Sequence, residues 1–247
     1  MNPLRIKRFS QTHLNRNKTD KSDAKMIYLY GQNQEVALWS PSPKEVEESK
    51  DIYQVMEQYI EFKAGLKSKI DALKIKKASK ELLKSIEEQI ANLTESINEL
   101  QEKSDNLMAQ YQPEMLRNIS SIKGIGKRTA SLLIISAEGF TSFENTKQLS
   151  SYFGLAPTEN TSGTSINGSR KISKMGNPLV RKKLYMCSLQ ASRYNKSCKN
   201  LYERLLAKGK PKKVALIAVV NKLLKQVFAI AKSGLPYDDE YKSHYPI

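Results

Sequence analysis

The sequence has 247 residues, with 41 Lys and Arg against 25 Asp and Glu and a formal net charge of +16. This length allows one large or two modest domains with hydrophobic cores. The only cysteines, Cys187 and Cys198, form no CxxC pair, which argues against a zinc site or a disulfide framework. No uninterrupted apolar run approaches the roughly 18 residues that span a bilayer, so we expect a cytoplasmic protein without membrane contact.

The positive charge is concentrated in the second half of the chain. Residues 1–112 hold 18 Lys and Arg against 17 Asp and Glu, residues 113–235 hold 22 against 5, and residues 236–247 hold 1 against 3. A concentrated positive field attracts polyphosphate because each neutralised phosphate releases counterions. The uneven distribution therefore favours nucleic acid as the partner over a basic surface that serves solubility alone.

The first 43 residues predict a basic opening followed by a helix. Thr19 or Asp20 can cap that helix, and Gly31 is a plausible end. The segment "EVALW" (35–39) predicts a short strand or an extended piece, and Pro41 and Pro43 then mark a boundary.

Asp20 and Asp23 stand three residues apart, on one face of this predicted helix. Two such carboxylates can reach one Mg²⁺, or each can hold one of two ions. The alternative is a capping residue and a surface acid, both solvated and paired with lysines.

Residues 44–112 predict two long helices with apolar stripes. The first stripe contains Ile52, Val55, Tyr59, Phe62, Leu66, Ile70 and Leu73, and the second contains Leu83, Ile86, Ile90, Leu93, Ile97, Leu100 and Leu107. Spacings that alternate between three and four are typical of a coiled-coil seam. Because "KIKKASK" (74–80) interrupts the pattern, we predict an antiparallel helical arm, or a dimerising coiled coil that uses the same stripes.

Residues 113–235 predict a basic helical domain that opens with a helix-hairpin-helix. Its turn contains Gly124 and Gly126, and the basic residues Lys123, Lys127 and Arg128 surround it. Glycines allow a tight turn, so the amides of the following helix can face a phosphate. The alternative is an ordinary packing corner between two helices; we favour phosphate contact because the glycine spacing and the basic flank coincide.

The middle of this domain predicts a helix that stops near Gly154, then a polar loop or β-hairpin, then a helix with Arg181, Lys182 and Lys183. A serine in that loop, such as Ser162, could attack a phosphodiester, although turn chemistry alone explains such residues as well. The domain ends with a helix at 210–234. We expect DNA to contact Lys123, Gly124, Gly126, Lys127, Arg128, Arg170, Lys174, Arg181 and Lys182.

These motifs, in this order, resemble the IS110/IS116 family of insertion-sequence transposases, which includes Piv/MooV-type invertases. The opening "NPLRIKRFSQTHLNRNKTDKSDAKMIYLYG" resembles the end of that family's RuvC-like DEDD domain. The segments "IKGIGKRTASLLI", "FENTKQLSSYFGLAP", "SGTS" and "KISKMGNPLVRKKLYM" resemble its C-terminal transposase domain. The resemblance covers nearly the whole chain.

The resemblance implies a function and a composite site. Asp20 and Asp23 would be the last two carboxylates of the DEDD quartet and would bind Mg²⁺. Ser162, or else Ser165, would attack DNA and form a covalent DNA–serine link. The family also implies a homo-oligomer (dimer or tetramer), an element-encoded guide RNA, and a place in the bacterial cytoplasm with the nucleoid.

The sequence departs from the family pattern at its start, since the first Asp and the Glu of the quartet lie upstream of "NP", which here follows Met1 directly. We therefore expect an N-terminally truncated, catalytically incomplete transposase. The alternative is a non-catalytic nucleic-acid-binding remnant or regulator, so whether the chain is an enzyme stays open.

The predicted fold is mainly α. It comprises a remnant of an α/β RuvC-like domain (1–43), an antiparallel coiled-coil arm (44–112), a basic helical domain with a helix-hairpin-helix (113–235) and a tail (236–247).

Overall fold

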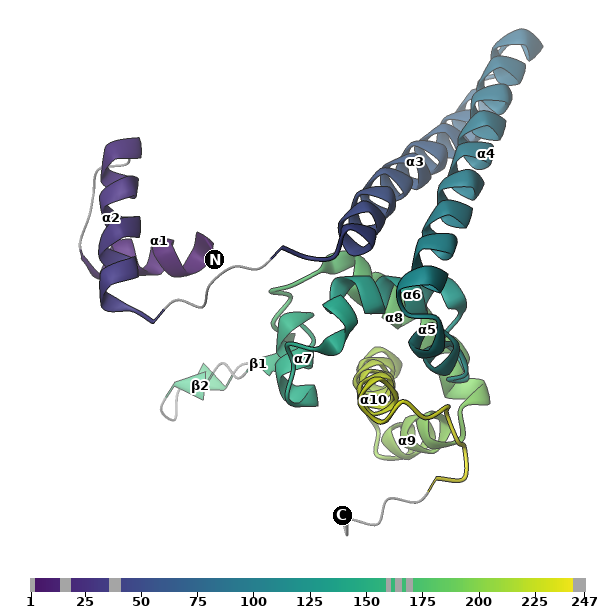
Figure 1. The fold of residues 1–247 in the computed structure, drawn as a ribbon. Coiled ribbons are helices and arrows are strands. Elements are labelled where there is room, and N and C mark those ends of the chain that lie inside the picture. The colour runs from purple at the N-terminus through teal and green to yellow at the C-terminus, as the bar shows by residue number, and fades with distance from the viewer. Residues whose placement is uncertain are drawn as a thin grey trace. The chain divides into compact units, whose positions relative to one another are not determined.

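The computed structural model describes residues 3–13, 19–35, 41–158, 161–162, 166–167 and 171–241, and at 161–162 and 166–167 only the backbone is described. The described part is mainly helical, which confirms the predicted fold class, and contains ten α-helices and two pairs of short strands (Figure 1). The chain divides into two compact units, residues 1–42 and residues 43–247. The predicted division into four segments stays a prediction.

The first unit contains helices α1 (Pro3–Thr12) and α2 (Asp20–Asn33). Thr19 caps α2, because its hydroxyl accepts a hydrogen bond from the Ser22 amide at 3.2 Å. The predicted end at Gly31 is wrong, since α2 continues to Asn33; a glycine costs a helix only about 1 kcal/mol and does not end it alone. Helix α1 was not predicted. The predicted extended piece at 35–39 falls largely on residues 36–40, which lie outside the described residues.

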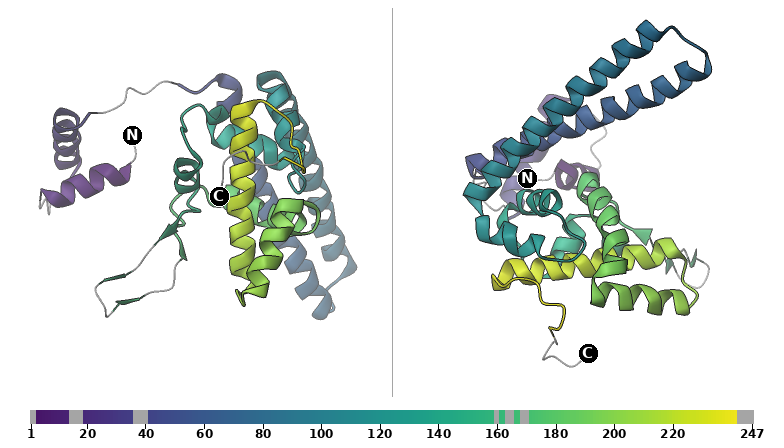
Figure 2. Two further views of the ribbon diagram at one scale, coloured as in Figure 1. Left: turned by 90° about the horizontal axis from the view of Figure 1, so that it is seen from below. Right: turned by 90° about the vertical axis from the view of Figure 1, so that its right-hand side faces the viewer.

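The second unit begins with the arm, an antiparallel pair of long helices. Helix α3 (Lys44–Ile75) and helix α4 (Lys80–Tyr111) run side by side, as Figure 2 shows. The chain reverses between them at 76–79, and Ser79 caps α4 by accepting from the Leu82 amide at 3.3 Å. The predicted hairpin is therefore present, whereas a dimerising coiled coil stays a prediction.

The predicted apolar stripe of α4 is buried or half-buried along its whole length, but the stripe of α3 was partly wrong. Val55 and Phe62 are 37% and 60% exposed, whereas Met56 is only 3% exposed. Consecutive helical residues point about 100° apart, so once Met56 enters the seam, Val55 turns toward solvent.

The remaining helices form a body below the arm, which we call the basic body. They are α5 (Pro113–Ser120), α6 (Lys127–Ser136), the short 3₁₀ helix η1 (Glu138–Phe140), α7 (Thr146–Tyr152), α8 (Pro178–Tyr194), α9 (Lys196–Ala207) and α10 (Lys212–Ser233). Helix α10 contacts α5, α7, α8 and α9, and eight of its side chains are buried. It ends at Gly234, whose φ of 70° is left-handed, as is typical of a helix C-terminus.

Helix α10 is also long and apolar enough to span a membrane by length and composition alone. In this structure it is the central helix of the basic body and contacts α5, η1, α7, α8 and α9. Burial of eight of its side chains against these neighbours accounts for part of its apolar character.

A β-ribbon connects α7 to α8, as predicted for the segment around Ser162. Strand β1 (Pro157–Thr158) pairs with β4 (Lys171–Ile172), and β2 (Thr161–Ser162) pairs with β3 (Ile166–Asn167), both antiparallel. At the base of the ribbon, the backbone at Gly154 lies very close to the backbone at Met175. A Cβ on Gly154, whose φ is +69°, would lie 2.8 Å from the Met175 carbonyl oxygen.

Substitution of Gly154 by Ala is expected to lower the free energy of unfolding by about 2–4 kcal/mol, because it adds a backbone clash to the strain of a positive φ. Gly209→Ala is the matched control, since Gly209 has φ +70° and no atom within 4 Å of the added Cβ. The control should cost about 1 kcal/mol. Denaturant unfolding of both variants measures the difference; equal losses would show that the close approach does not matter.

Candidate nucleic-acid-binding site

The predicted glycine turn lies between α5 and α6, and its two glycines serve different purposes. Gly124 has φ +105°, and a Cβ there would lie 2.9 Å from both the Cβ and the backbone nitrogen of Ala191 in α8. Gly124 therefore allows the turn to pack closely against α8. This is the role that the alternative interpretation, a packing corner between helices, gives to it. Gly126 is the N-cap of α6 and has open space around its Cα. Because the first amides of a helix have no intrahelical acceptor, this side of the turn can receive a phosphate.

Three basic side chains flank the turn, and all three are exposed. Lys123 forms an ion pair with Asp239, and the Lys127 Nζ lies 3.7 Å from the Asp105 Oδ2. Arg128 forms no ion pair with any residue that the structure describes, while its backbone carbonyl accepts a hydrogen bond from the Tyr53 hydroxyl at 3.0 Å. The Arg128 guanidinium is thus the one of the three that meets a phosphate without first losing an internal acidic partner.

The basic residues of α8 are tied to neighbouring elements. The Lys183 Nζ lies 2.8 Å from Glu57 Oε1, and the Lys182 Nζ lies 3.5 Å from Glu57 Oε2. Both lysines therefore join α8 to the arm, although Lys182 remains 59% exposed. Arg181 donates a hydrogen bond from its guanidinium to the Phe153 carbonyl oxygen at 3.0 Å, beside the base of the β-ribbon. Arg181 therefore has a structural partner that sequence alone did not reveal.

We expect Arg181→Gln to lower the free energy of unfolding by about 1–3 kcal/mol, because it removes a charged donor from a partly buried carbonyl. The matched control is Arg193→Gln on the same helix, whose exposed side chain has no partner among the described residues. Thermal unfolding should distinguish the two variants. Equal melting temperatures would indicate that Arg181 is free to serve DNA binding alone.

The predicted nucleophile lies in the β-ribbon. Ser162 is in strand β2, opposite Ile166 of β3, and only its backbone is described. Ser165 and Arg170 lie outside the described residues. Lys174 is exposed just after β4, and its amide donates to the Gly154 carbonyl at 3.1 Å. The choice between the two serines therefore stays a prediction.

The predicted metal ligands lie in the first turn of α2, where Asp20 and Asp23 are both exposed. Two carboxylates at this spacing supply oxygen ligands that suit Mg²⁺, but they supply only part of a coordination shell. Across residues 3–13, 19–35 and the described part of the second unit, no group of three or more residues among His, Cys, Asp and Glu is placed to hold a metal ion. The aspartates belong to the first unit and Ser162 to the second. A composite site formed by all three stays a prediction.

The structure adds partners that sequence analysis missed. The acidic residues Asp239 and Glu240, placed in the predicted tail, form ion pairs with Lys123 and Lys196. The run "DDE" at 238–240 after a strongly basic domain was the available signal. Both cysteines are free and buried, and burial raises the pKa of the Cys198 thiol to about 12, which disfavours the reactive thiolate at neutral pH.

Comparison with known proteins gives consistent similarities. Residues 116–203 match the family described as "Transposase IS116/IS110/IS902 family". The pilin gene-inverting proteins of Moraxella lacunata and Moraxella bovis are each 30% identical to this chain over 246 residues, which cover 96% of the chain and 73% of each relative. An uncharacterized 43.6 kDa protein of insertion element IS110 from Streptomyces coelicolor is 31% identical over 120 residues, 49% of the chain and 29% of that protein.

Proposed function

The chain belongs to the IS116/IS110/IS902 family of insertion-sequence transposases and site-specific recombinases, and we propose that it binds DNA through the turn between α5 and α6 and acts in DNA strand exchange. The relatives named as pilin gene-inverting proteins indicate the reaction class, an inversion or insertion of a DNA segment. The observation that carries the proposal is that the family match, residues 116–203, contains the turn, the β-ribbon and α8.

Binding at the turn would be directed to the DNA backbone. The open side of Gly126, the first amides of α6 and the exposed Arg128 side chain can all meet phosphate oxygens. Contacts of this kind fix the position of the protein on DNA but carry no sequence information. Sequence choice would then come from elsewhere, and we propose the element-encoded guide RNA that the family resemblance implies, by analogy with other guided systems.

Arg128→Gln is expected to weaken DNA binding several-fold at low salt and to reduce the slope of log K against log salt by about 0.9, the value for one lost phosphate contact. The control Lys67→Gln removes one positive charge from an exposed position on the arm. Fluorescence anisotropy with a short duplex at several salt concentrations gives both quantities. The same change in both variants would mean that only total charge matters.

The chemical step that we propose uses a serine of the β-ribbon. The Ser162 Oγ would attack the scissile phosphorus and form a new phosphorus–oxygen bond, and the bond from phosphorus to one DNA ester oxygen would break. The proton lost by the serine hydroxyl balances the proton taken up by the leaving DNA oxygen, which departs as a hydroxyl. The product is a phosphodiester between the serine and the DNA strand, which retains the energy of the original phosphodiester, so strand joining needs no external energy source. Asp20 and Asp23 would hold Mg²⁺, which when bound polarises the phosphate.

Two carboxylates offset little of the charge of two close Mg²⁺ ions. We therefore propose that Asp20 and Asp23 act together with acidic ligands beyond those described, supplied by a partner chain of different sequence. On this basis the purified chain alone is catalytically incomplete.

The purified chain with Mg²⁺ and duplex DNA is therefore expected to form no more covalent DNA–protein adduct than Ser162→Ala, measured on a denaturing gel with labelled DNA. An adduct that is lost in Ser162→Ala and kept in Ser165→Ala would establish the nucleophile and overturn the proposed incompleteness. An adduct that is lost only in Ser165→Ala would move the nucleophile to Ser165.

The second candidate is a non-catalytic role in which the chain occupies the ends of the element. It is favoured because the basic body belongs to a compact unit, residues 43–247, that does not contain Asp20 or Asp23. The two candidates differ in their dependence on ions. Strand transfer requires Mg²⁺, whereas backbone binding mainly weakens as salt is added.

A further inference from the structure

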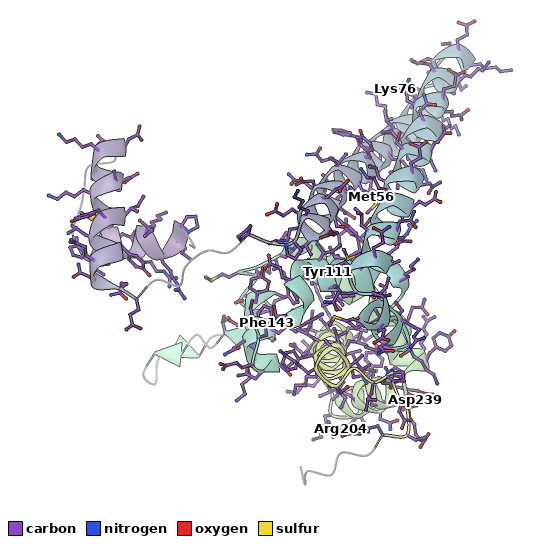
Figure 3. All side chains as sticks on the ribbon, in the orientation of Figure 1. Met56, Lys76, Tyr111, Phe143, Arg204 and Asp239 are labelled. Atoms are coloured by element: carbon purple, nitrogen blue, oxygen red, sulfur yellow. The ribbon has the colours of Figure 1, made fainter. Side chains whose placement is uncertain are left out.

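The segment after α10 folds back along the turn between α5 and α6. The Asn118 side-chain amide donates to the Gly234 carbonyl at 2.7 Å, the Tyr237 amide donates to the Ser121 hydroxyl at 2.9 Å, and Lys123 pairs with Asp239. All three pairs are separated by 116 residues in sequence. Residues 234–239 therefore follow residues 118–123 step for step, which is more than a single incidental contact. Figure 3 labels Asp239 on this segment.

The same segment also reaches the start of α9. The Lys196 Nζ lies 2.7 and 2.9 Å from the two carboxylate oxygens of Glu240. Asn195, which caps α9, donates from its side-chain amide to the Lys123 carbonyl at 3.4 Å, so the two lysines lie on adjacent parts of one surface. Two carboxylates of the C-terminal segment thus cover two lysines at the edge of the proposed DNA-binding turn.

The two carboxylates of this segment pair with lysines as the phosphates of a nucleic acid would. The hydrogen bond from Lys123 holds the pKa of the Asp239 carboxyl below its usual value, and the hydrogen bond to Glu240 raises the pKa of Lys196. Both shifts favour the charged forms of Asp239 and Lys196. The lysines keep substantial exposure, 54% for Lys123 and 56% for Lys196. Ion pairs this exposed are weak and are screened by salt.

We propose that residues 234–240 are a self-inhibitory segment, whose carboxylates occupy the phosphate-binding positions of Lys123 and Lys196 until duplex DNA displaces them. The inference rests on the proposed function, because it assumes that DNA binds at this turn. DNA carries one negative charge per about 1.7 Å of helix axis. A phosphate backbone can therefore replace the half-buried Asp239 carboxylate and the exposed Glu240 carboxylate and engage both lysines at once. The segment then raises the DNA concentration required for binding and disfavours weak, nonspecific contacts.

The test compares the unaltered chain with the variant Asp239→Asn/Glu240→Gln in duplex binding by fluorescence anisotropy. The variant should bind about three- to tenfold more tightly at low salt, because no internal carboxylate competes. Its slope of log K against log salt should be steeper by up to about 1.8, the value for two additional phosphate contacts. The control Glu95→Gln/Glu99→Gln removes the same charge from exposed positions on α4. Equal tightening in the control would reduce the effect to net charge and overturn the inference.

A second measurement on the unaltered chain avoids any folding defect in the variant. Hydrogen exchange of the Tyr237 amide, which donates to Ser121, should become faster when DNA is bound. Unchanged or slower exchange with DNA bound would overturn the displacement. If the chain binds DNA through Arg128 but the tail variant behaves like the wild type, only this inference fails. If neither chain binds DNA, the proposed function fails with it.

Discussion

Helix α10 is the packing partner that α5, α7, α8 and α9 share, so the basic body depends on the burial of its apolar side chains. Full burial of a Val, Leu or Ile side chain contributes about 1.5–3 kcal/mol, and α10 buries eight residues, most of them of these types. A polar contact also helps to orient α7 against α10. The Ser150 hydroxyl donates a hydrogen bond to the Asn221 side chain at 2.9 Å. The elements that carry the proposed DNA-binding turn and the β-ribbon are thus held by one helix.

Around that helix, close backbone approaches define the surface. Gly124 lets the turn approach α8 at Ala191, and Gly154 lets the end of α7 approach the segment before α8. The first contact is on α8 and the second lies just before it, and α8 also meets the arm through Lys183 and Glu57. The turn, the ribbon and the arm are therefore all positioned by contacts to α8 or to the residues just before it. A protein that must hold DNA at a fixed distance from a nucleophile benefits from such shared positioning.

Much of this architecture could be predicted from sequence because it depends on local patterns. The helical arm follows from alternating spacings of three and four, the end of α10 from Gly234, and the β-ribbon from a polar Ser/Thr/Asn/Gly stretch. The features that were not predicted depend on contacts with residues elsewhere in the sequence. Helix α1 is short and has no buried side chain; its Phe9 ring lies 5.2 Å from the ring of Tyr30 on α2, a contact that local pattern does not show.

In the candidate site, too, local features could be predicted from the sequence but long-range contacts could not. Basic residues beside a glycine turn are visible in the sequence, but their partners are not: Arg181 bonds to Phe153, 28 residues away, and Lys123 to Asp239, 116 residues away. Such pairs arise only when the core brings remote segments together. The spatial relation between Asp20, Asp23 and Ser162 is a question of the same kind, since these residues lie in different units.

The position of α10 after all the helices it packs against also governs when the basic body can form during synthesis. Its partner α5 precedes it by about 100 residues, so the contacts between these two helices are non-local, and non-local contacts form slowly. Translation makes α5 through α9 before the helix they pack against. A nascent chain on the ribosome thus exposes apolar faces and a dense positive charge together until residues 212–233 emerge, and we expect this interval to be when the protein most needs chaperones.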